Sequence, residues 1–244
     1  MTEPGATAMP ADKASVAEDF IDIFVAPAKV FARRAKASPM VPFVVVWIVM
    51  VALFFGSKSA MQPIFDATIA QQQAAAMKAN PQLTQDQLDK AKPFTNIALN
   101  VAGVIGVPIL LLIVGVLTWI VGRLVMGGTL EFGTAILIAS YSFLPKVLAS
   151  ILGLVQAMLM DVSRLTSPYQ LSFSAARFFD PSSMSMGLYN LLGQVDPFTI
   201  WAAALIGVGV MHAGKLDKSK ATTTAVIMFV LGCVPSLFQV IMGK

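Results

Sequence analysis

The hydrophobic residues of this chain come in long blocks, and charged residues separate the blocks. Four stretches contain no Lys, Arg, Asp or Glu: 37–57, 93–122, 197–214 and 221–243. Crossing the hydrocarbon core of a membrane takes about 17–25 apolar helical residues, so each stretch can span it. Nothing in the sequence alternates apolar and polar residues over about ten positions, as the strands of a membrane barrel do. The pattern therefore predicts helices that cross a bilayer.

A fifth candidate span is interrupted by Pro145 and Lys146. A lysine at the centre of a membrane helix costs about 2.5–3.5 kcal/mol, but each Leu, Ile or Val offsets about 0.3–0.6 kcal/mol of it. The Leu, Ile and Val residues on both sides of Lys146 outweigh the cost, so we expect a kinked span. The predicted fold is an all-α integral membrane bundle of five transmembrane helices, at about 40–57, 96–121, 132–160, 197–213 and 222–242.

The segment before the first span is predicted to form an amphipathic surface helix. Residues 1–14 are expected to be a disordered cytosolic tail, and Ser15 with Glu18 has the spacing of a capping box. Residues 15–37 then present an apolar face and a basic end, which is typical of a helix on the inner membrane surface. The alternative is a helix that packs on the bundle, and Pro27 could divide it in two. The residues assigned to the membrane surface are Phe20, Phe24, Phe31, Arg33 and Arg34.

Composition and charge agree with a membrane protein and predict its orientation. The 244 residues are 57% hydrophobic and 12% charged, against about 25% charged in soluble domains. Lys and Arg crowd the segment before the first span and two short connections on the same side. The positive-inside rule then predicts a cytosolic N-terminus and an outer C-terminus. We expect the bacterial cytoplasmic (inner) membrane.

Two further patterns predict how the helices are arranged. Thr84 and Gln87 have the spacing of a second capping box, so the first outer loop is expected to be a helical hairpin. Pairs of small residues four positions apart let membrane helices approach closely. Such pairs are Ala102 with Gly106, Ala135 with Ala139, and Ala203 with Gly207.

The residues that usually carry chemistry are scarce. His212 and Cys233 are single, so they predict neither a zinc site nor a disulfide. The motifs H-E-x-x-H, G-x-S-x-G and the P-loop are absent, and the net charge of +4 is spread over loops without aromatic residues between the charges. We therefore expect no catalytic site, no cofactor, no metal and no binding of nucleic acid.

Lys146 is the exception, because an ionisable residue at membrane depth indicates function by default. It is the candidate intramembrane polar site. The alternative is a lysine whose stem lies in lipid while its amine reaches an interface. No acidic residue is expected at its depth, which weakens the case for an ion pathway.

Several short motifs occur in an order that resembles the bacterial branch of the Yip (Ypt-interacting protein) domain family, over roughly residues 20–242. They begin with Phe24-Val25-Ala26-Pro27 before the first span, and Asp196-Pro197-Phe198-Thr199-Ile200-Trp201 opens the fourth. The resemblance implies a five-span bundle with a cytosolic N-terminus. Eukaryotic relatives are associated with Rab-type GTPases, but this chain lacks their Asp-Leu-Tyr-Gly-Pro signature. The residues that carry the motifs or the packing are Gly128, Phe132, Gly133, Tyr141, Pro145, Asp196, Phe198 and Trp201.

Two functions remain open from the sequence. The first is a non-enzymatic membrane protein that shapes or binds lipid and associates with other membrane proteins or with a second copy of itself. The second is a carrier or channel for a small solute or ion, with a pathway near the kinked third span.

Overall fold

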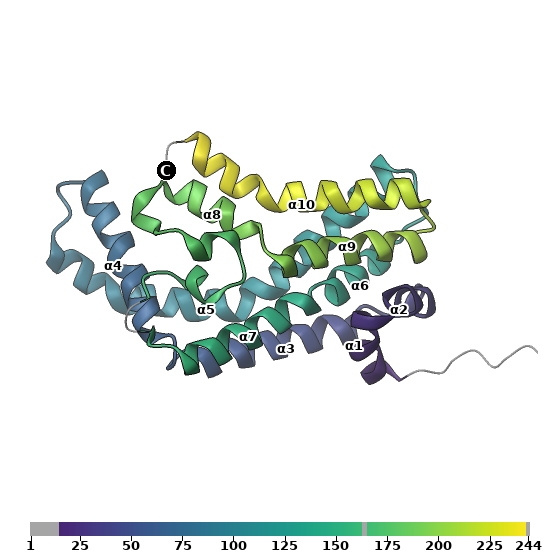
Figure 1. Ribbon diagram of the computed structural model, residues 1–244, viewed down its shortest axis with the longest axis horizontal. Coiled ribbons are helices and arrows are strands. Elements are labelled where there is room, and N and C mark those ends of the chain that lie inside the picture. The colour runs from purple at the N-terminus through teal and green to yellow at the C-terminus, as the bar shows by residue number, and fades with distance from the viewer. Residues whose placement is uncertain (1–14, 163–164, 243–244) are drawn as a thin grey trace, which may run out of the picture.

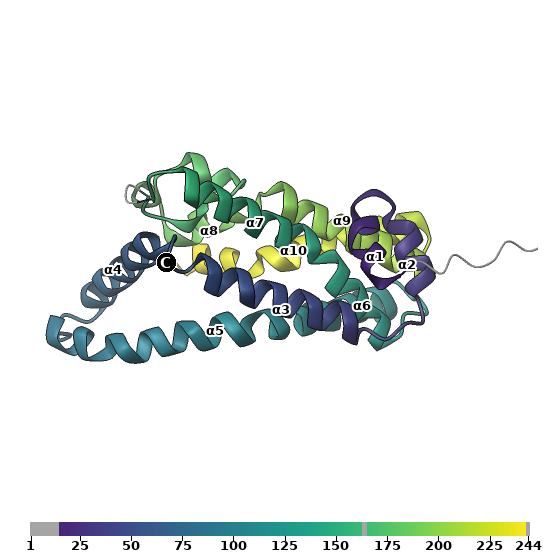
Figure 2. The ribbon, with the colours of Figure 1, turned by 90° about the horizontal axis from the view of Figure 1, so that it is seen from below.

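The computed structural model of the chain describes residues 15–162 and 165–242, and every regular element in them is a helix. The predicted disordered tail, residues 1–14, lies outside the described residues. The long helices run side by side along the longest axis of the molecule (Figure 1). Two short N-terminal helices cover one end of this bundle, and a helical hairpin extends from the other end (Figure 2).

Four helical segments are long and apolar enough to cross a membrane. They are α3 (Met40–Ser57), α5 with its π-helical end (Gln85–Val125), the pair α6 and α7 (Phe132–Leu159), and α10 (Lys218–Ile241). The helix α9 (Pro197–His212) is about 24 Å long at 1.5 Å per residue, which is short for a span. With α8 (Met186–Gln194), from which it is bent by 56°, it makes a fifth candidate. The described residues thus hold four spans, or five if the bent pair counts as one.

The third span is broken at the position that its sequence indicated. One residue, Phe143, lies between the helices α6 (Phe132–Ser142) and α7 (Leu144–Leu159). Pro145 occupies the first turn of α7, where its missing amide hydrogen costs no helical hydrogen bond. By contrast, α5 (Gln85–Trp119) runs without a break through Pro93 and Pro108. Apolar side chains are exposed along α3, α5, α7 and α10, whereas α6 is almost entirely buried.

The N-terminal segment forms two helices rather than one. The capping box of Ser15 and Glu18 begins α1 (Val16–Val25), because each residue's side chain accepts a hydrogen bond from the other's backbone amide. Pro27 begins α2 (Pro27–Arg34), so the predicted division at this proline is confirmed. The two helices contact each other, and α2 packs against α9.

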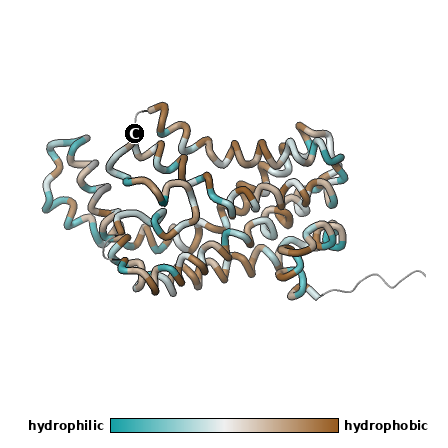
Figure 3. Tube along the Cα trace, in the orientation of Figure 1, coloured by the Kyte–Doolittle hydropathy of each residue, from teal (hydrophilic) through white to brown (hydrophobic). Residues whose placement is uncertain are grey.

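The first outer loop is the predicted helical hairpin. It consists of α4 (Gln62–Ala79) and the first part of α5, which starts at the capping box of Thr84 and Gln87. The second span is therefore the continuation of the second helix of this α4–α5 hairpin, and its helix begins at Gln85, well before the predicted residue 96. Figure 3 shows polar residues gathered where α4 and α5 meet, at the tip of this hairpin, and apolar residues along the helices of the bundle.

The segment between α7 and α9, named the second outer loop after its predicted side of the membrane, folds over the bundle. Its short 3-10 helices, Pro168–Leu171, Ala175–Phe178 and Pro181–Ser183, precede α8. The Ala175 amide donates to the carbonyl of Val195 over 2.9 Å. The rings of Tyr169 and Tyr189 meet edge to face at 5.3 Å. These contacts hold the loop against the start of α9.

Small residues set the closest helix contacts, but not all the predicted pairs do so. A methyl group added at Gly209 of α9 would lie 2.6 Å from Cγ2 of the buried Ile138 in α6. One added at Gly207 would lie 3.0 Å from Cβ of Ala225 in α10. Ala135 and Ala139 are buried in the core. The space beside Gly106 is open, so the prediction that Gly106 lets helices approach closely is wrong.

We expect the substitution Gly209→Val to destabilise the bundle by about 1–3 kcal/mol, because Ile138 has no exposed surface and cannot move aside. Gly106→Val is the matched control, since it also puts a valine into a membrane helix. Thermal unfolding in detergent measures both. Equal midpoints for the two variants would contradict the close contact of α6 and α9.

Candidate functional site

A buried carboxylate joins the N-terminal helices to the third span. Asp19 of α1 has no exposed surface. Nε of Arg33 donates to its Oδ1 over 2.6 Å, and Nε of Arg34 donates to its Oδ2 over 2.5 Å. The hydroxyl of Tyr141, in the middle of the third span, donates to Oδ2 over 3.1 Å. One side chain of α1 is therefore bonded to both α2 and α6.

The charged side chains of this cluster bind one another. Arg33 also donates to Oδ2 of Asp22 over 2.6 Å, so its guanidinium bridges two carboxylates. The guanidinium presents several donors in one plane, which suits it to such bridging. Asp22 is 34% exposed, whereas Asp19 is fully buried. Removing a buried charge costs far more when its partners stay behind unpaired, so Asp19 is the member on which the cluster depends.

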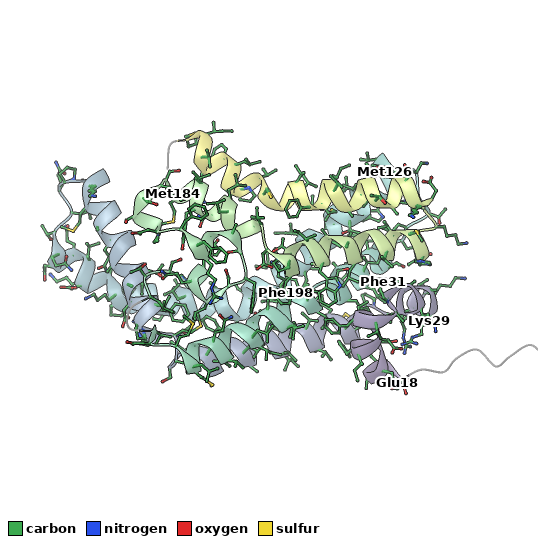
Figure 4. The ribbon with its side chains drawn as sticks, viewed as in Figure 1. Glu18, Lys29, Phe31, Met126, Met184 and Phe198 are labelled. Carbon is green, nitrogen blue, oxygen red and sulfur yellow. The ribbon has the colours of Figure 1, made fainter. Side chains whose placement is uncertain are left out.

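Aromatic rings surround the cluster on the side of the bundle. The rings of Phe20 and Phe31 lie 5.7 and 6.3 Å from that of Tyr141. The ring of Phe24 meets Trp201 of α9 edge to face at 5.4 Å. The pair α1 and α2 is named the hairpin from here on, and Figure 4 shows Phe31 on its side toward the bundle and Glu18 and Lys29 on its side away from the bundle. The aromatic contacts and the ion pairs therefore stabilise the same interface, between the pair α1 and α2 and the bundle.

The residues assigned to the membrane surface therefore contact protein. Phe31 is fully buried, and Phe20 and Phe24 are half-buried against the bundle. Arg33 and Arg34 bind carboxylates. This is the arrangement that the sequence left open as its alternative. The apolar side chains that α1 does expose are Ile21 and Val25, with 70% and 77% of their surface free.

Gly128 lies where two connections meet at the same end of the bundle. The Thr129 amide donates to the carbonyl of Gly214 over 3.2 Å, and a methyl group added at Gly128 would lie 2.7 Å from the carbonyl oxygen of Gly122. Gly127 has a φ of +73°, which favours glycine. The motif therefore ties the turn before α6 to the turn after α9.

The start of α6 carries the next two motif residues. The ring of Phe132 meets Trp119 edge to face at 6.1 Å, and Gly133 faces Pro39. The neighbouring Thr134 hydroxyl donates to the carbonyl of Ala35 over 2.9 Å. These contacts join α6 to α5 and to the link between α2 and α3, so the motif residues serve packing here.

Lys146 lies beyond the break in the third span and lines two cavities. The larger has a volume of about 500 Å³ between α3, α7 and the second outer loop, and the smaller has about 160 Å³ between α5, α6, α9 and α10. Nζ of Lys146 donates to the hydroxyl of Thr199 in the first turn of α9. The lysine therefore connects α7 to α9.

Asp196 lines the larger cavity together with Lys146. Its Oδ1 caps α9 by accepting from the amides of Phe198 and Thr199 over 2.7 and 3.0 Å. The ring of Phe198 packs on Phe173 of the outer loop at 5.5 Å. The expectation that no acidic residue reaches the depth of Lys146 is thus wrong. The bend between α8 and α9 brings Asp196 inward from the end of the span.

Two important residues were missed because their local sequence has another explanation. Asp19 reads as an acid in the first turn of a helix, where the helix dipole favours it. Thr199 reads as an ordinary polar residue after a cap. Their partners lie 122 and 53 positions away along the chain, so no spacing rule could pair them.

Comparison with known families places the chain in one of them. The family described as the Yip1 domain matches residues 21–238. The match covers most of the chain, from the middle of α1 to the end of α10, so the chain belongs to the Yip1 domain family. No curated protein and no solved structure matches the chain. Family and apolar helices together make it an integral membrane protein.

We expect Asp19→Asn to release the hairpin from the bundle. The change removes the negative charge that both guanidinium groups bind, while Arg33 keeps its bond to Asp22, so we expect a cost of about 2–3 kcal/mol. Hydrogen exchange of the amides in α1 and α2 should then accelerate by about 30–150-fold. In the control Asp22→Asn, the more exposed pair should change exchange by less than about fivefold. Unchanged exchange in Asp19→Asn would contradict the role of this carboxylate.

Proposed function

We propose that this chain is a non-enzymatic protein of the bacterial inner membrane that shapes the cytosolic leaflet. Its working element is the hairpin of α1 and α2, which the bundle holds at the membrane surface. Exposed apolar side chains of α1 enter the leaflet beside the first span, while the ion pairs of Asp19 keep the hairpin in place. The buried Asp19 carboxylate is committed to structural partners, which supports a holding role rather than a chemical one.

The distribution of basic residues supports a cytosolic position for the hairpin. The turn before α6 is bonded to the turn after α9, and α2 packs on α9, so three basic segments meet at one end of the bundle. Cytosolic ends of membrane helices carry an excess of Lys and Arg. The basic residues at this end are Lys29, Arg33, Arg34, Lys36, Arg123, Lys215, Lys218 and Lys220.

The exposed face of α1 supports insertion into the leaflet. Ile21 and Val25 are four residues apart and therefore share one face of the helix. Met40 and Val41 at the start of α3 are also exposed, at 61% and 50%. Burying one such side chain is worth about 1.5–3 kcal/mol, so two on a short helix suffice for shallow insertion once the hairpin is anchored. Anchoring matters because a free helix of ten residues would not hold its shape in water.

The double substitution Ile21→Glu, Val25→Glu tests this proposal. The purified chain is reconstituted into liposomes at increasing protein-to-lipid ratio, and vesicle diameters are measured by electron cryomicroscopy. The unsubstituted chain should reduce the mean diameter, and the double variant should lose most of this effect because α1 no longer enters the leaflet.

Phe94→Glu is the matched control. Phe94 of α5 is 74% exposed, and its replacement should leave the effect intact. The first part of α5 lies at the other end of the molecule from α1 and α2 (Figure 2). If the double variant remodels vesicles as well as the unsubstituted chain, the proposed role of α1 is wrong.

A solute carrier is the second candidate, and the two cavities beside Lys146 favour it. The smaller cavity is lined mainly by apolar side chains, among them Leu110, Ile206 and Met228, which do not form a polar path. Single cysteines along α7, in a background with Cys233→Ala, distinguish the functions. A carrier predicts labelling of Ala149 and Gly153 positions by a membrane-impermeant thiol reagent, with protection by the transported solute. The membrane-shaping proposal predicts no labelling that a solute protects.

A further inference from the structure

The larger cavity lies beside Lys146, on the other side of the break in the third span from Tyr141, which binds the N-terminal helix α1. Its walls come from α3, α7, the second outer loop and the link into α9. Its volume of about 500 Å³ falls within the range of small-molecule sites. It takes no part in the ion pairs of Asp19, so an inference about it does not depend on the proposed function.

The cavity contains one positive and one negative side chain. Lys146 and Asp196 are the charged members of its lining among the described residues. They do not form a salt bridge, because the described part of the chain shows none within 4.0 Å for either residue. Two opposite charges thus line one cavity without forming a direct ion pair.

Both charges keep hydrogen-bonding capacity toward the cavity. The ammonium of Lys146 can donate three hydrogen bonds, and among the described side chains only the Thr199 hydroxyl accepts one from it. Asp196 uses Oδ1 for both backbone amides of the cap, and no described residue donates to Oδ2. Buried charges are normally paired or bound to a ligand. The cap fixes Asp196 in place, and Thr199 fixes Lys146.

Most of the rest of the lining is apolar or aromatic, with three serines, Ser57, Ser150 and Ser172, among it. Leu53 and Phe54 of α3, Leu154 of α7 and Phe173 of the second outer loop all line the cavity. Such walls suit the acyl or glycerol part of an amphiphile, whereas a freely soluble ion would gain nothing from them.

We propose that this cavity binds a zwitterionic glycerophospholipid of the phosphoethanolamine type. Its phosphate contacts the ammonium of Lys146, and its amine contacts Oδ2 of Asp196. The shared chemistry is a phosphate joined to an ammonium group. The apolar walls make the lipid, rather than its free headgroup, the ligand.

Native mass spectrometry of the full chain in mild detergent tests the site with three probes: phosphatidylethanolamine, phosphatidylglycerol and free glycerophosphoethanolamine. One phosphatidylethanolamine should bind most tightly. Lys146→Met and Asp196→Asn should each raise its Kd about tenfold or more, since each removes one charged hydrogen bond. Asparagine still caps a helix, so Asp196→Asn keeps the fold. It should also remove the preference over phosphatidylglycerol.

Matched controls change the same residue types elsewhere. Lys58→Met removes a lysine that donates to Asn100, and Asp217→Asn changes the cap of α10. Both should keep the Kd within about twofold, and Lys146→Arg should retain binding. Unfolding midpoints check that each variant is folded.

Three results would overturn the proposal. Equal affinities in the unsubstituted chain and both site variants would exclude the site. Tighter binding of phosphatidylglycerol, lost only in Lys146→Met, would indicate an anion site instead. A free headgroup that binds as tightly as the lipid would exclude the lipid as the ligand.

Discussion

The carboxylate of Asp19 lies between two arginines of α2 and a tyrosine of the third span, with no surface exposed to solvent. A buried charge of this kind is tolerated only when its partners stay in place. It therefore couples the position of α1 to that of α2 and of α6. The phenylalanines of the hairpin add apolar contacts on Tyr141 and Trp201, so the hairpin and the membrane helices form one packed unit.

The two sides of the break in the third span make different contacts. Tyr141, before the break, receives the hairpin, and Lys146, after the break, lies at a cavity and reaches α9. Phe143 separates the two helices, and Pro145 lies in the first turn of α7. Because α6 contacts α3, α5 and α9, a displacement of α6 would also displace these three helices. The break thus places two polar side chains at different sites along one span.

The membrane helices could be predicted because lipid imposes a simple rule, namely about twenty apolar residues per helix. Charged residues such as Lys36 and Lys58 mark the ends of such segments directly. The surroundings of Asp19, Thr199 and Asp196 could not be predicted, because each has a sufficient local explanation as a cap or first-turn residue. Their second role arises from contacts with residues far along the chain. Gly106 shows the opposite case: the pair of small residues predicts a close contact between helices, but the space beside Gly106 is open.

Distance measurement between spin labels tests most directly whether hairpin and bundle form one unit. Labels at Ala32 of α2 and Ser219 of α10, both exposed, would be attached through cysteines in a Cys233→Ala background and measured in lipid nanodiscs. The account predicts a single narrow distance distribution, since Asp19 and the aromatic contacts hold α2 against α9. A broad distribution, with the hairpin sampling many positions on the membrane surface, would contradict it.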